Sequence, residues 1–181
     1  MAPEEAFQSV LTAAKAGAGW AWERIYGDLY TPVLGYLRAR GAPDAEDVAS
    51  ETFLQVARNI ASFEGTETSF RSWVFVIAHR RLLDARRADG RRGETVPLEP
   101  ELDTAGGDTE EDALADVIDP DLERALKGLT DDQRNVIALR VVAGLSLQET
   151  ADVMGKRVGA IKALQRRALD SLRKSLESVS K

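Results

Sequence analysis

Apolar residues recur every three or four positions along most of the chain, which is the spacing of helices with one buried face. Two such stripes run through residues 6–16 and 20–40. Pro32 interrupts the second stripe, so we expect a kink there or a break into two helices. A third stripe covers residues 45–60 and follows Asp44, an acid that suits a helix N-cap. The first third of the chain therefore predicts helices.

Residues 73–78 are less clear, because the run Trp-Val-Phe-Val-Ile-Ala is rich in residue types that favour strands. Phe70, Trp73 and Ile77 nevertheless keep helical spacing, and a run of arginines continues the same pattern. The sequence offers no second segment that would pair with a strand here. We therefore predict a helix that fades near Ala88-Asp89-Gly90.

The last third of the chain predicts shorter helices that begin with capping boxes. In this motif a Ser or Thr and a Glu or Gln three residues later satisfy each other's backbone amides. Two examples are present, Thr130 with Gln133 and Ser146 with Glu149. Gly155 ends the helix that Ser146 begins, and a longer basic helix follows over about residues 158–176. This order is typical of a helix-turn-helix, although an amphipathic helix with a solvated basic face is the alternative.

The final helix has an inward apolar stripe that contains Ile161, Leu164 and Ala168. In a helix-turn-helix, side chains at the start of the second helix reach base edges, while those further along contact phosphate. We predict four base-reading residues, Arg157, Val158, Ala160 and Lys162. We predict phosphate contacts from Arg166 and Arg167.

Charge is distributed in blocks along the 181 residues. The net charge is −6, yet residues 94–123 hold twelve acids and no Lys or Arg, so the rest of the chain carries +6. Residues 80–92 carry +4 and residues 156–174 carry +6. A block of like charge is usually a solvated face. Two basic blocks that each continue a helix favour contact with nucleic-acid phosphate.

These patterns predict an all-α protein of two small helical domains, residues 1–92 and residues 121–181. A flexible acidic linker, residues 93–120, joins them and contains Pro and paired Gly. Fully extended, the linker would reach on the order of 90 Å. That reach exceeds two turns of duplex, roughly 70 Å, so each domain could occupy its own site on one DNA.

The absence of cysteine and the single histidine, His79, narrow the possible chemistry. Disulfides and thiol chemistry are excluded, and a lone histidine argues against a zinc or iron site. The sequence holds no nucleophile–base pair and no glycine-rich phosphate loop, so we expect no catalytic residue, metal or cofactor. No signal peptide and no membrane-spanning apolar run is visible, which predicts a cytoplasmic protein without membrane insertion.

Motifs in each half point to a family. In the second half they are residues 125–134, which end in the first capping box, and residues 144–162, which contain the second. In the first half they are residues 44–53 and the motif Phe-Arg-Ser-Trp at 70–73, with Ile-Ala-His-Arg at 77–80 and Asp84. These stretches resemble the fourth and second conserved regions of bacterial RNA polymerase sigma factors. The resemblance covers residues 20–92 and 120–176, and the lack of a domain between them is typical of the extracytoplasmic-function (ECF) group.

The resemblance implies a role for each helix. The helix over residues 45–60 is similar to the one that docks on the clamp of the largest subunit of core RNA polymerase, and its exposed contacts would be Asp47, Glu51, Phe53 and Gln55. The C-terminal domain would meet the flap of the second-largest subunit and the distal promoter element. The helix from Phe70 would bind the proximal element through Arg71, Trp73, His79, Arg80, Arg81 and Arg87. Phe53 and Trp73 also fit core positions, and His79 fits a polar surface or a phosphate contact.

The implied function is promoter recognition, DNA opening and transcription initiation for a specialised regulon, with a cognate anti-sigma factor as a further partner. Arg80 and Arg157 depart from the usual family pattern, which leaves the promoter sequence open. The acidic linker would run through a channel of the polymerase, screen the basic helices or act as a tether. The alternatives are a stand-alone transcription regulator with an operator-binding helix-turn-helix, and an enzyme.

Overall fold

The computed structural model describes residues 3–93 and 125–179. Within these two ranges every regular element is a helix. The predicted all-α fold is therefore confirmed. The predicted acidic linker lies outside the described residues, except that Gly93 is the last residue of α4.

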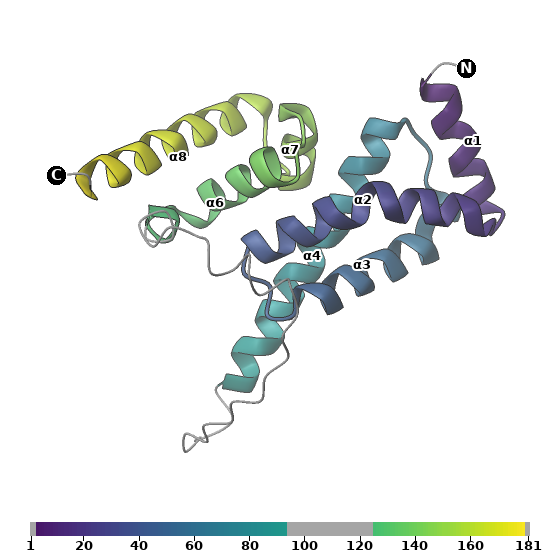
Figure 1. Ribbon diagram of the computed structural model, residues 1–181, viewed down its shortest axis with the longest axis horizontal. Coiled ribbons are helices and arrows are strands. Elements are labelled where there is room, and N and C mark those ends of the chain that lie inside the picture. The colour runs from purple at the N-terminus through teal and green to yellow at the C-terminus, as the bar shows by residue number, and fades with distance from the viewer. Residues whose placement is uncertain (1–2, 94–124, 180–181) are drawn as a thin grey trace.

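Four α-helices and one short 3-10 helix form the N-terminal domain. They are α1 (Pro3–Lys15), α2 (Gly19–Ala39), α3 (Ala45–Asn59), η1 (Ile60–Ser62) and α4 (Glu67–Gly93). Helices α2, α3 and α4 pack against one another, and α1 crosses one end of this group (Figure 1). The apolar stripes meet in a core in which Leu37, Phe75 and Leu82 are fully buried. Leu11 and Ala14 join the same core, so α1 belongs to this domain.

The C-terminal domain contains α6 (Asp131–Ile137), the π-helical segment η3 (Ala138–Val142), α7 (Leu147–Met154) and α8 (Val158–Val179). Both predicted capping boxes are present. The amide nitrogen of Gln133 lies 3.3 Å from Thr130 Oγ1, and that of Glu149 lies 3.2 Å from Ser146 Oγ. These caps satisfy amides that a helix leaves free at its start, and they fix where α6 and α7 begin.

Of the predicted features, the N-cap at Asp44 is confirmed and a break at Pro32 is wrong, while a kink at Pro32 stays a prediction. Asp44 caps α3, because its carboxylate accepts a hydrogen bond of 2.9 Å from the amide of Asp47. Helix α2 runs without a break through Pro32, since Leu29 and Val33 on either side of it are buried in the core and hold both turns in place. Helix α4 continues to Gly93, three residues past the stretch Ala88-Asp89-Gly90 where its end was predicted.

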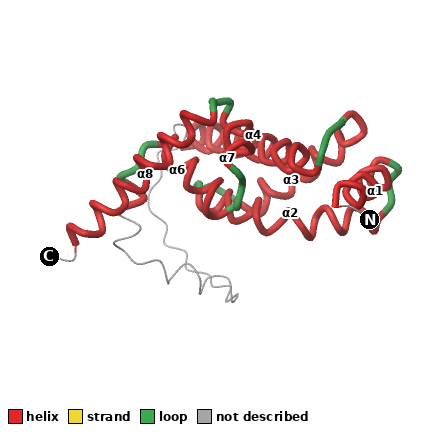
Figure 2. The backbone as a smooth tube through the Cα atoms, turned by 90° about the horizontal axis from the view of Figure 1, so that it is seen from above, coloured by secondary structure: helices red, strands yellow, loops and turns green. Residues whose placement is uncertain are grey.

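The two domains lie in contact rather than apart. Helix α7 packs on α4, and η3 packs on α2 (Figures 1 and 2). Leu139 and Leu145 are fully buried in a core shared with the N-terminal helices. A smaller cluster around Val136, Ala151 and Ile161 holds α6, α7 and α8 together. The sequence predicted two domains, but it gave no sign of this junction.

Candidate nucleic-acid interface

Helices α7 and α8 form the predicted helix-turn-helix. Gly155 ends α7 in the left-handed conformation, with φ of 60°. Its amide and that of Lys156 donate to carbonyls of the last turn of α7, Asp152 O at 3.3 Å and Ala151 O at 3.0 Å. Glycine adopts this conformation without a steric penalty, which lets the chain turn sharply before α8. The predicted turn is therefore confirmed.

Most of the predicted distal DNA contacts point outward from α8. Ile161 and Ala168 are fully buried and fix the inward face of the helix. Five predicted residues are exposed, namely Arg157, Ala160, Lys162, Arg166 and Arg167. Val158 is only half-exposed, because it packs against the small cluster beneath the motif.

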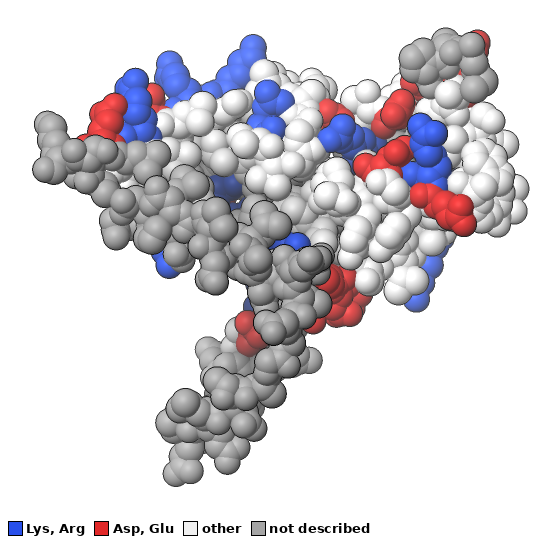
Figure 3. All heavy atoms as spheres, in the orientation of Figure 1, with Lys and Arg blue, Asp and Glu red and all other residues white. Residues whose placement is uncertain are grey.

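The basic side chains of this set are available for a ligand. Arg157 directly precedes α8, and its carbonyl oxygen accepts hydrogen bonds from the amides of Ala160 at 2.9 Å and Ile161 at 3.2 Å. Its guanidinium takes no part in these bonds and is exposed. Arg157, Lys162, Arg166 and Arg167 form no ion pair with any residue that the structure describes. Figure 3 shows Lys and Arg side chains gathered along the outer edge of α8. Such a stripe on the second helix suits duplex DNA.

The arginines of α4 are mostly engaged within the protein. Arg81 donates to Gln55 Oε1 at 2.8 Å and lies 3.9 Å from Glu51 Oε2, so it links α4 to α3. Arg87 pairs with Asp84 at 3.2 Å on the surface. Arg80 is exposed and forms no ion pair with a described residue.

Two further α4 residues point into the junction between the domains. Arg71 donates to the carbonyl oxygen of Ala143 at 2.6 Å. His79 is half-buried, with Nδ1 2.7 Å from the hydroxyl of Tyr36. That hydroxyl donates to Asn135 Oδ1 at 2.9 Å, so the hydroxyl oxygen accepts from Nδ1–H of His79. His79 thus points into the junction between the domains, and its expected contact with DNA stays a prediction.

Sequence reasoning missed the charged pair at the centre of this junction. Arg40 Nη2 lies 2.7 Å from Asp131 Oδ1, and the Arg40 side chain is only 1% exposed. Burial and then the nearby positive charge of Arg40 lower the pKa of His79. Burial opposes ionisation of Asp131, but the hydrogen bond and charge of Arg40 outweigh it and lower the pKa of that carboxyl. The sequence contained one sign of this pair, the acid Asp131 at the first position of α6. Its place in the first turn of the helix already explains that acid.

Trp73 supports a loop rather than offering a free aromatic face. Its ring centroid lies 5.1 Å from that of Phe63 and 5.7 Å from that of Phe70, which is buried. Lys15 and Gln8 of α1 tie the same loop down, donating to the carbonyls of Phe63 at 2.5 Å and Gly65 at 2.9 Å. The core reading of Trp73 is therefore the better one.

The α3 surface differs from the expectation at two residues, Phe53 and Gln55. Asp47 and Glu51 are exposed as predicted, whereas Gln55 is half-buried by its bond to Arg81. Phe53 is only 7% exposed, and its ring packs 4.9 Å from that of Tyr26. The expected exposure of Phe53 is thus wrong.

Leu54 occupies the exposed position that was assigned to its neighbour. Its side chain is 57% exposed. It follows Asp47 by seven residues and Glu51 by three, so helical spacing alone places it on their face. The same spacing puts Phe53 on the inward face, and this signal was present in the sequence.

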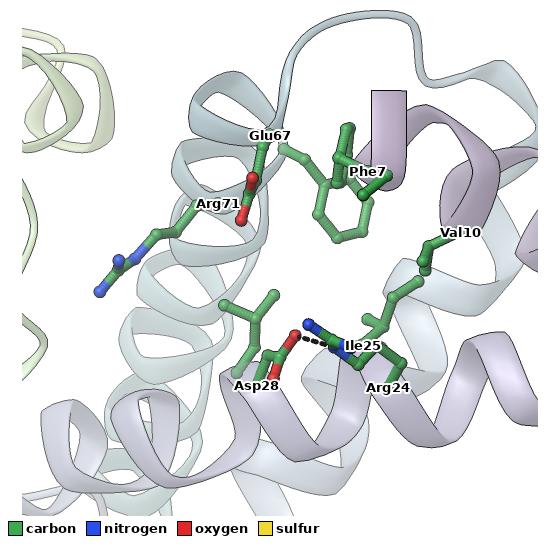
Figure 4. Close-up of a pocket in the computed structure, with 10 residues that line it drawn as sticks. Phe7, Val10, Arg24, Ile25, Asp28, Glu67 and Arg71 are labelled. Carbon is green, nitrogen blue, oxygen red and sulfur yellow. Dashed lines mark hydrogen bonds and ion pairs between the residues drawn. The ribbon is translucent and has the colours of Figure 1, made fainter. Parts of the chain in front are cut away.

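A cavity of about 520 Å³ lies between α1, α2 and α4. Phe7, Val10 and Ile25 form its apolar wall, and the pair Arg24–Asp28, with Arg24 Nε 2.9 Å from Asp28 Oδ2, lies at its rim (Figure 4). Within the described ranges no cluster of three or more His, Cys, Asp or Glu could hold a metal ion. None of the helices described there is long and apolar enough to cross a membrane.

Two family models match the chain. Residues 22–92 match Sigma-70 region 2, and residues 125–174 match Sigma-70 region 4. The match to the first falls on the N-terminal domain from α2 onward, and the match to the second falls on the helix-turn-helix domain. The fold and the exposed cations of α8 therefore define a protein of the sigma factor class.

Proteins with similar sequences are ECF RNA polymerase sigma factors. The chain is 34% identical over 166 residues to the ECF RNA polymerase sigma factor BldN of Streptomyces coelicolor, covering 90% of this chain and 63% of that protein. It is 31% identical over 176 residues to the ECF RNA polymerase sigma factor SigD of Mycobacterium tuberculosis, covering 93% and 83%. The chain thus spans about 63% of the length of BldN.

Two solved structures share the fold. CnrH, solved in complex with the cytosolic domain of CnrY, superposes with a TM-score of 0.68 at 23% identity, covering 93% of this chain and 96% of CnrH. The sigma factor RpoE of Bartonella quintana, solved with the anti-sigma factor NepR, gives a TM-score of 0.66 at 22% identity, covering 86% and 96%. Taken with the family models and relatives, the chain belongs to the ECF RNA polymerase sigma factors. Sigma factors are transcription initiation factors and not enzymes.

Proposed function

We propose that the chain binds core RNA polymerase in the cytoplasm and directs it to the promoters of a specialised set of genes. The observation that carries this proposal is the presence, in one chain, of sigma regions 2 and 4 with an exposed set of charged side chains on each. Region 4 offers Lys162, Arg166 and Arg167 of α8, which form no ion pair with a described residue, and region 2 offers the exposed acids of α3. A stand-alone regulator with an operator-binding helix would not need region 2.

The polymerase-binding surface of the proposal is the outward face of α3. Asp47 and Glu51 provide charged contacts, and Leu54 provides an apolar contact on the same face, one turn beyond Glu51. Helix-to-helix docking needs such an apolar contact inside a polar rim. Gln55 acts mainly through Arg81, and Phe53 holds α3 on the core from behind.

DNA contacts are divided between the domains. The distal promoter element would meet α8 through Arg157, Ala160, Lys162, Arg166 and Arg167, with Val158 at the edge of the contact. The proximal element would meet α4 through Arg80 and Arg87, and also through Arg71 and Arg81 once these exchange their partners within the protein for phosphate. Trp73 and His79 would contribute by positioning the loop and the junction.

Control by an anti-sigma factor is part of the proposal. RpoE of Bartonella quintana was solved with the anti-sigma factor NepR, and CnrH with the cytosolic domain of CnrY. Those partners belong to those proteins. The family likeness supports a partner of the same kind here.

The direct test mixes the purified chain with core polymerase from a related bacterium and with genomic DNA. A stable complex that starts transcripts at defined sites is expected. A chain that binds duplex DNA but neither joins the polymerase nor starts transcripts would instead support a stand-alone regulator.

The α3 surface is tested by Leu54→Ala. Removal of this exposed contact should weaken polymerase binding by about 1 kcal/mol, roughly fivefold, without changing the free energy of unfolding. Val141→Ala is the matched control, because Val141 is also an exposed apolar residue, 66% exposed, but lies on η3. Equal effects of the two changes on polymerase binding would refute the assigned surface.

A further inference from the structure

The junction between the two domains is held by a set of contacts that we call the latch. Its members are Tyr36, Arg40, Arg71 and Arg86 on the N-terminal side and Asp131, Asn135 and Ala143 on the C-terminal side. Leu139 and Leu145 lie fully buried behind these polar contacts. The junction therefore combines specific polar contacts with a buried apolar layer, as a stable interface does.

The central pair of the latch leaves each domain dependent on the other. The Arg40 guanidinium is buried, and the carboxylate that neutralises it belongs to Asp131 of the other domain. Arg86 Nη1 lies 3.7 Å from the same carboxylate oxygen, and Arg86 also donates to the carbonyl of Arg40. A buried cation needs such a partner, because desolvation of an unpaired charge is expensive.

Arg71 connects the latch to DNA binding. Its guanidinium donates to the Ala143 carbonyl, and Figure 4 shows the side chain directed away from the cavity and toward the C-terminal helices. Arg71 is also one of the cations proposed for the proximal promoter element. One guanidinium cannot hold the C-terminal domain and a DNA phosphate in the same geometry.

We propose that the latch is an autoinhibitory contact, which must open before α4 engages the promoter. The effect of the latch on promoter binding rests on the proposed function, whereas the closed contact itself does not. The outward face of α3 and the cations of α8 stay exposed in the closed form. The closed chain can therefore approach polymerase and duplex, while Arg71 becomes available to the proximal element only on opening.

The latch also has the features of a contact that opens readily. Arg40 Nε and Arg71 Nε are both buried and have no hydrogen-bond partner among the residues described. A buried donor without a partner costs free energy, and opening returns it to water. The closed form is thus held by good pairs and weakened by two unsatisfied atoms.

A disulfide tests the latch directly. A Cβ placed on Gly35 would lie 3.1 Å from Val142 Cγ1 across the junction. In a disulfide with an S–S bond of about 2.05 Å, the Cβ of one cysteine lies about 3 Å from the other sulfur. The double variant Gly35→Cys/Val142→Cys therefore fits a bond that locks the closed form. The chain has no native cysteine to compete with it.

The readout is the affinity of the oxidised and reduced double variant for a fluorescent duplex of random sequence, over a series of salt concentrations. The oxidised form should bind more weakly, because Arg71 cannot reach phosphate. With one fewer contact, its slope of log affinity against log salt should be shallower by about 0.9. Failure of the disulfide to form under mild oxidation, or identical slopes for both forms, would overturn the proposal.

An opening variant gives the opposite change. Gly35→Leu places a larger side chain against Val142, and Gly27→Leu makes the same change on α2 where nothing lies within 4 Å. Gly35→Leu should bind the duplex roughly fivefold tighter than Gly27→Leu, with a steeper salt slope. Equal affinities would contradict the inference.

The same preparations separate this inference from the proposed function. With core polymerase, promoter-directed transcription by the double variant should fall by about tenfold or more on oxidation and return on reduction. If the reduced form starts no transcripts, the proposed function fails, while disulfide formation and the duplex affinities still decide the latch.

Discussion

The two basic helices of this chain carry similar charge in the sequence but differ in what that charge is free to do. On α4, Arg71, Arg81 and Arg86 all bind acceptors from other elements. On α8, Lys162 and Arg166 pair with no residue that the structure describes. The difference follows from their surroundings, because α4 lies between α3 and the C-terminal domain, whereas the outer face of α8 meets no other helix among those the structure describes.

This contrast teaches that a basic stretch is not by itself a binding surface. Helix α8 is ready for phosphate as it stands. On helix α4 Arg80 is exposed, but Arg71 and Arg81 can bind phosphate only if they change partners. The changes below, from the largest expected effect to the smallest, are designed to break or sharpen that contrast.

The largest effect is expected from removing two cations of α8. Lys162→Ala/Arg166→Ala should weaken promoter-directed transcription by about 2 kcal/mol, roughly thirtyfold, because each contact is worth about 1 kcal/mol or more. Binding to core polymerase should be unchanged, since α3 is untouched. Gel filtration with polymerase and transcript yield measure the two properties.

The control for this change is Arg173→Ala/Lys174→Ala on the same helix. It removes the same charge, but Arg173 lies near Asp170 and Glu177, each at 3.9 Å, so its charge is partly neutralised. If the control lost as much activity, general charge rather than the placement of Lys162 and Arg166 would explain the effect.

A smaller effect is expected at the latch. Asp131→Asn removes the charge that neutralises Arg40, while Asp132→Asn alters a carboxylate that lies 3.0 Å from Lys156 in its own domain. Because the Asp131 side chain is 61% exposed, we expect about 1 kcal/mol, a roughly fivefold shift toward the open form. Distances between dyes on the two domains measure the shift, and equal shifts for both variants would argue against a specific pair.

The smallest effect concerns pH. The pKa of His79 is lowered in the closed form, so the neutral ring is favoured there, and opening lets the pKa return toward its ordinary value. The open form then binds the proton more readily, and stability of the closed form is lost as pH falls below about 6.5. Asp131, whose pKa is also lowered, stays ionised across this range.

The groups that face His79 set the size of this effect. They are Tyr36 and Arg40 from α2 and its C-cap, Arg86 from α4, and Asp131 and Asp132 from α6. The cations favour the neutral ring and remain beside it on opening, whereas the acids favour the protonated ring and move away. The rise in the pKa of His79 therefore comes from relief of burial and is small. His79→Gln keeps a polar partner for Tyr36 and cannot titrate, so opening between pH 7.5 and 5.5 should vanish in that variant. The same pH response in both proteins would exclude His79 as its source.

Much of the fold could be predicted from local pattern. Capping boxes, the turn at Gly155 and the helical spacing from Phe70 onward each depend on residues a few positions apart, and the structure confirms all three. The exposed cations of α8 were predictable for the same reason, since the buried stripe through Ile161 and Ala168 fixes the outward face.

The junction could not be predicted, because its contacts join residues far apart in the sequence. Tyr36 and Asn135 are 99 positions apart, and Arg40 and Asp131 are 91 apart. The position of each of these side chains in its own helix does not show whether it binds a residue of the other domain or water. Phe53 is a different case, because helical spacing already placed Leu54 and not Phe53 on the outward face, and the resemblance to a family motif overrode it.

The most direct measurement places one dye on α3 and one on α8 of the cysteine-free chain, at engineered cysteines away from both interfaces. Energy transfer is then followed for the free protein and for its complex with core polymerase and promoter DNA. High transfer in the free chain and a marked fall in the complex are expected, because region 4 must leave α4 before both promoter elements are held. Unchanged transfer, or no complex at all, would contradict the account.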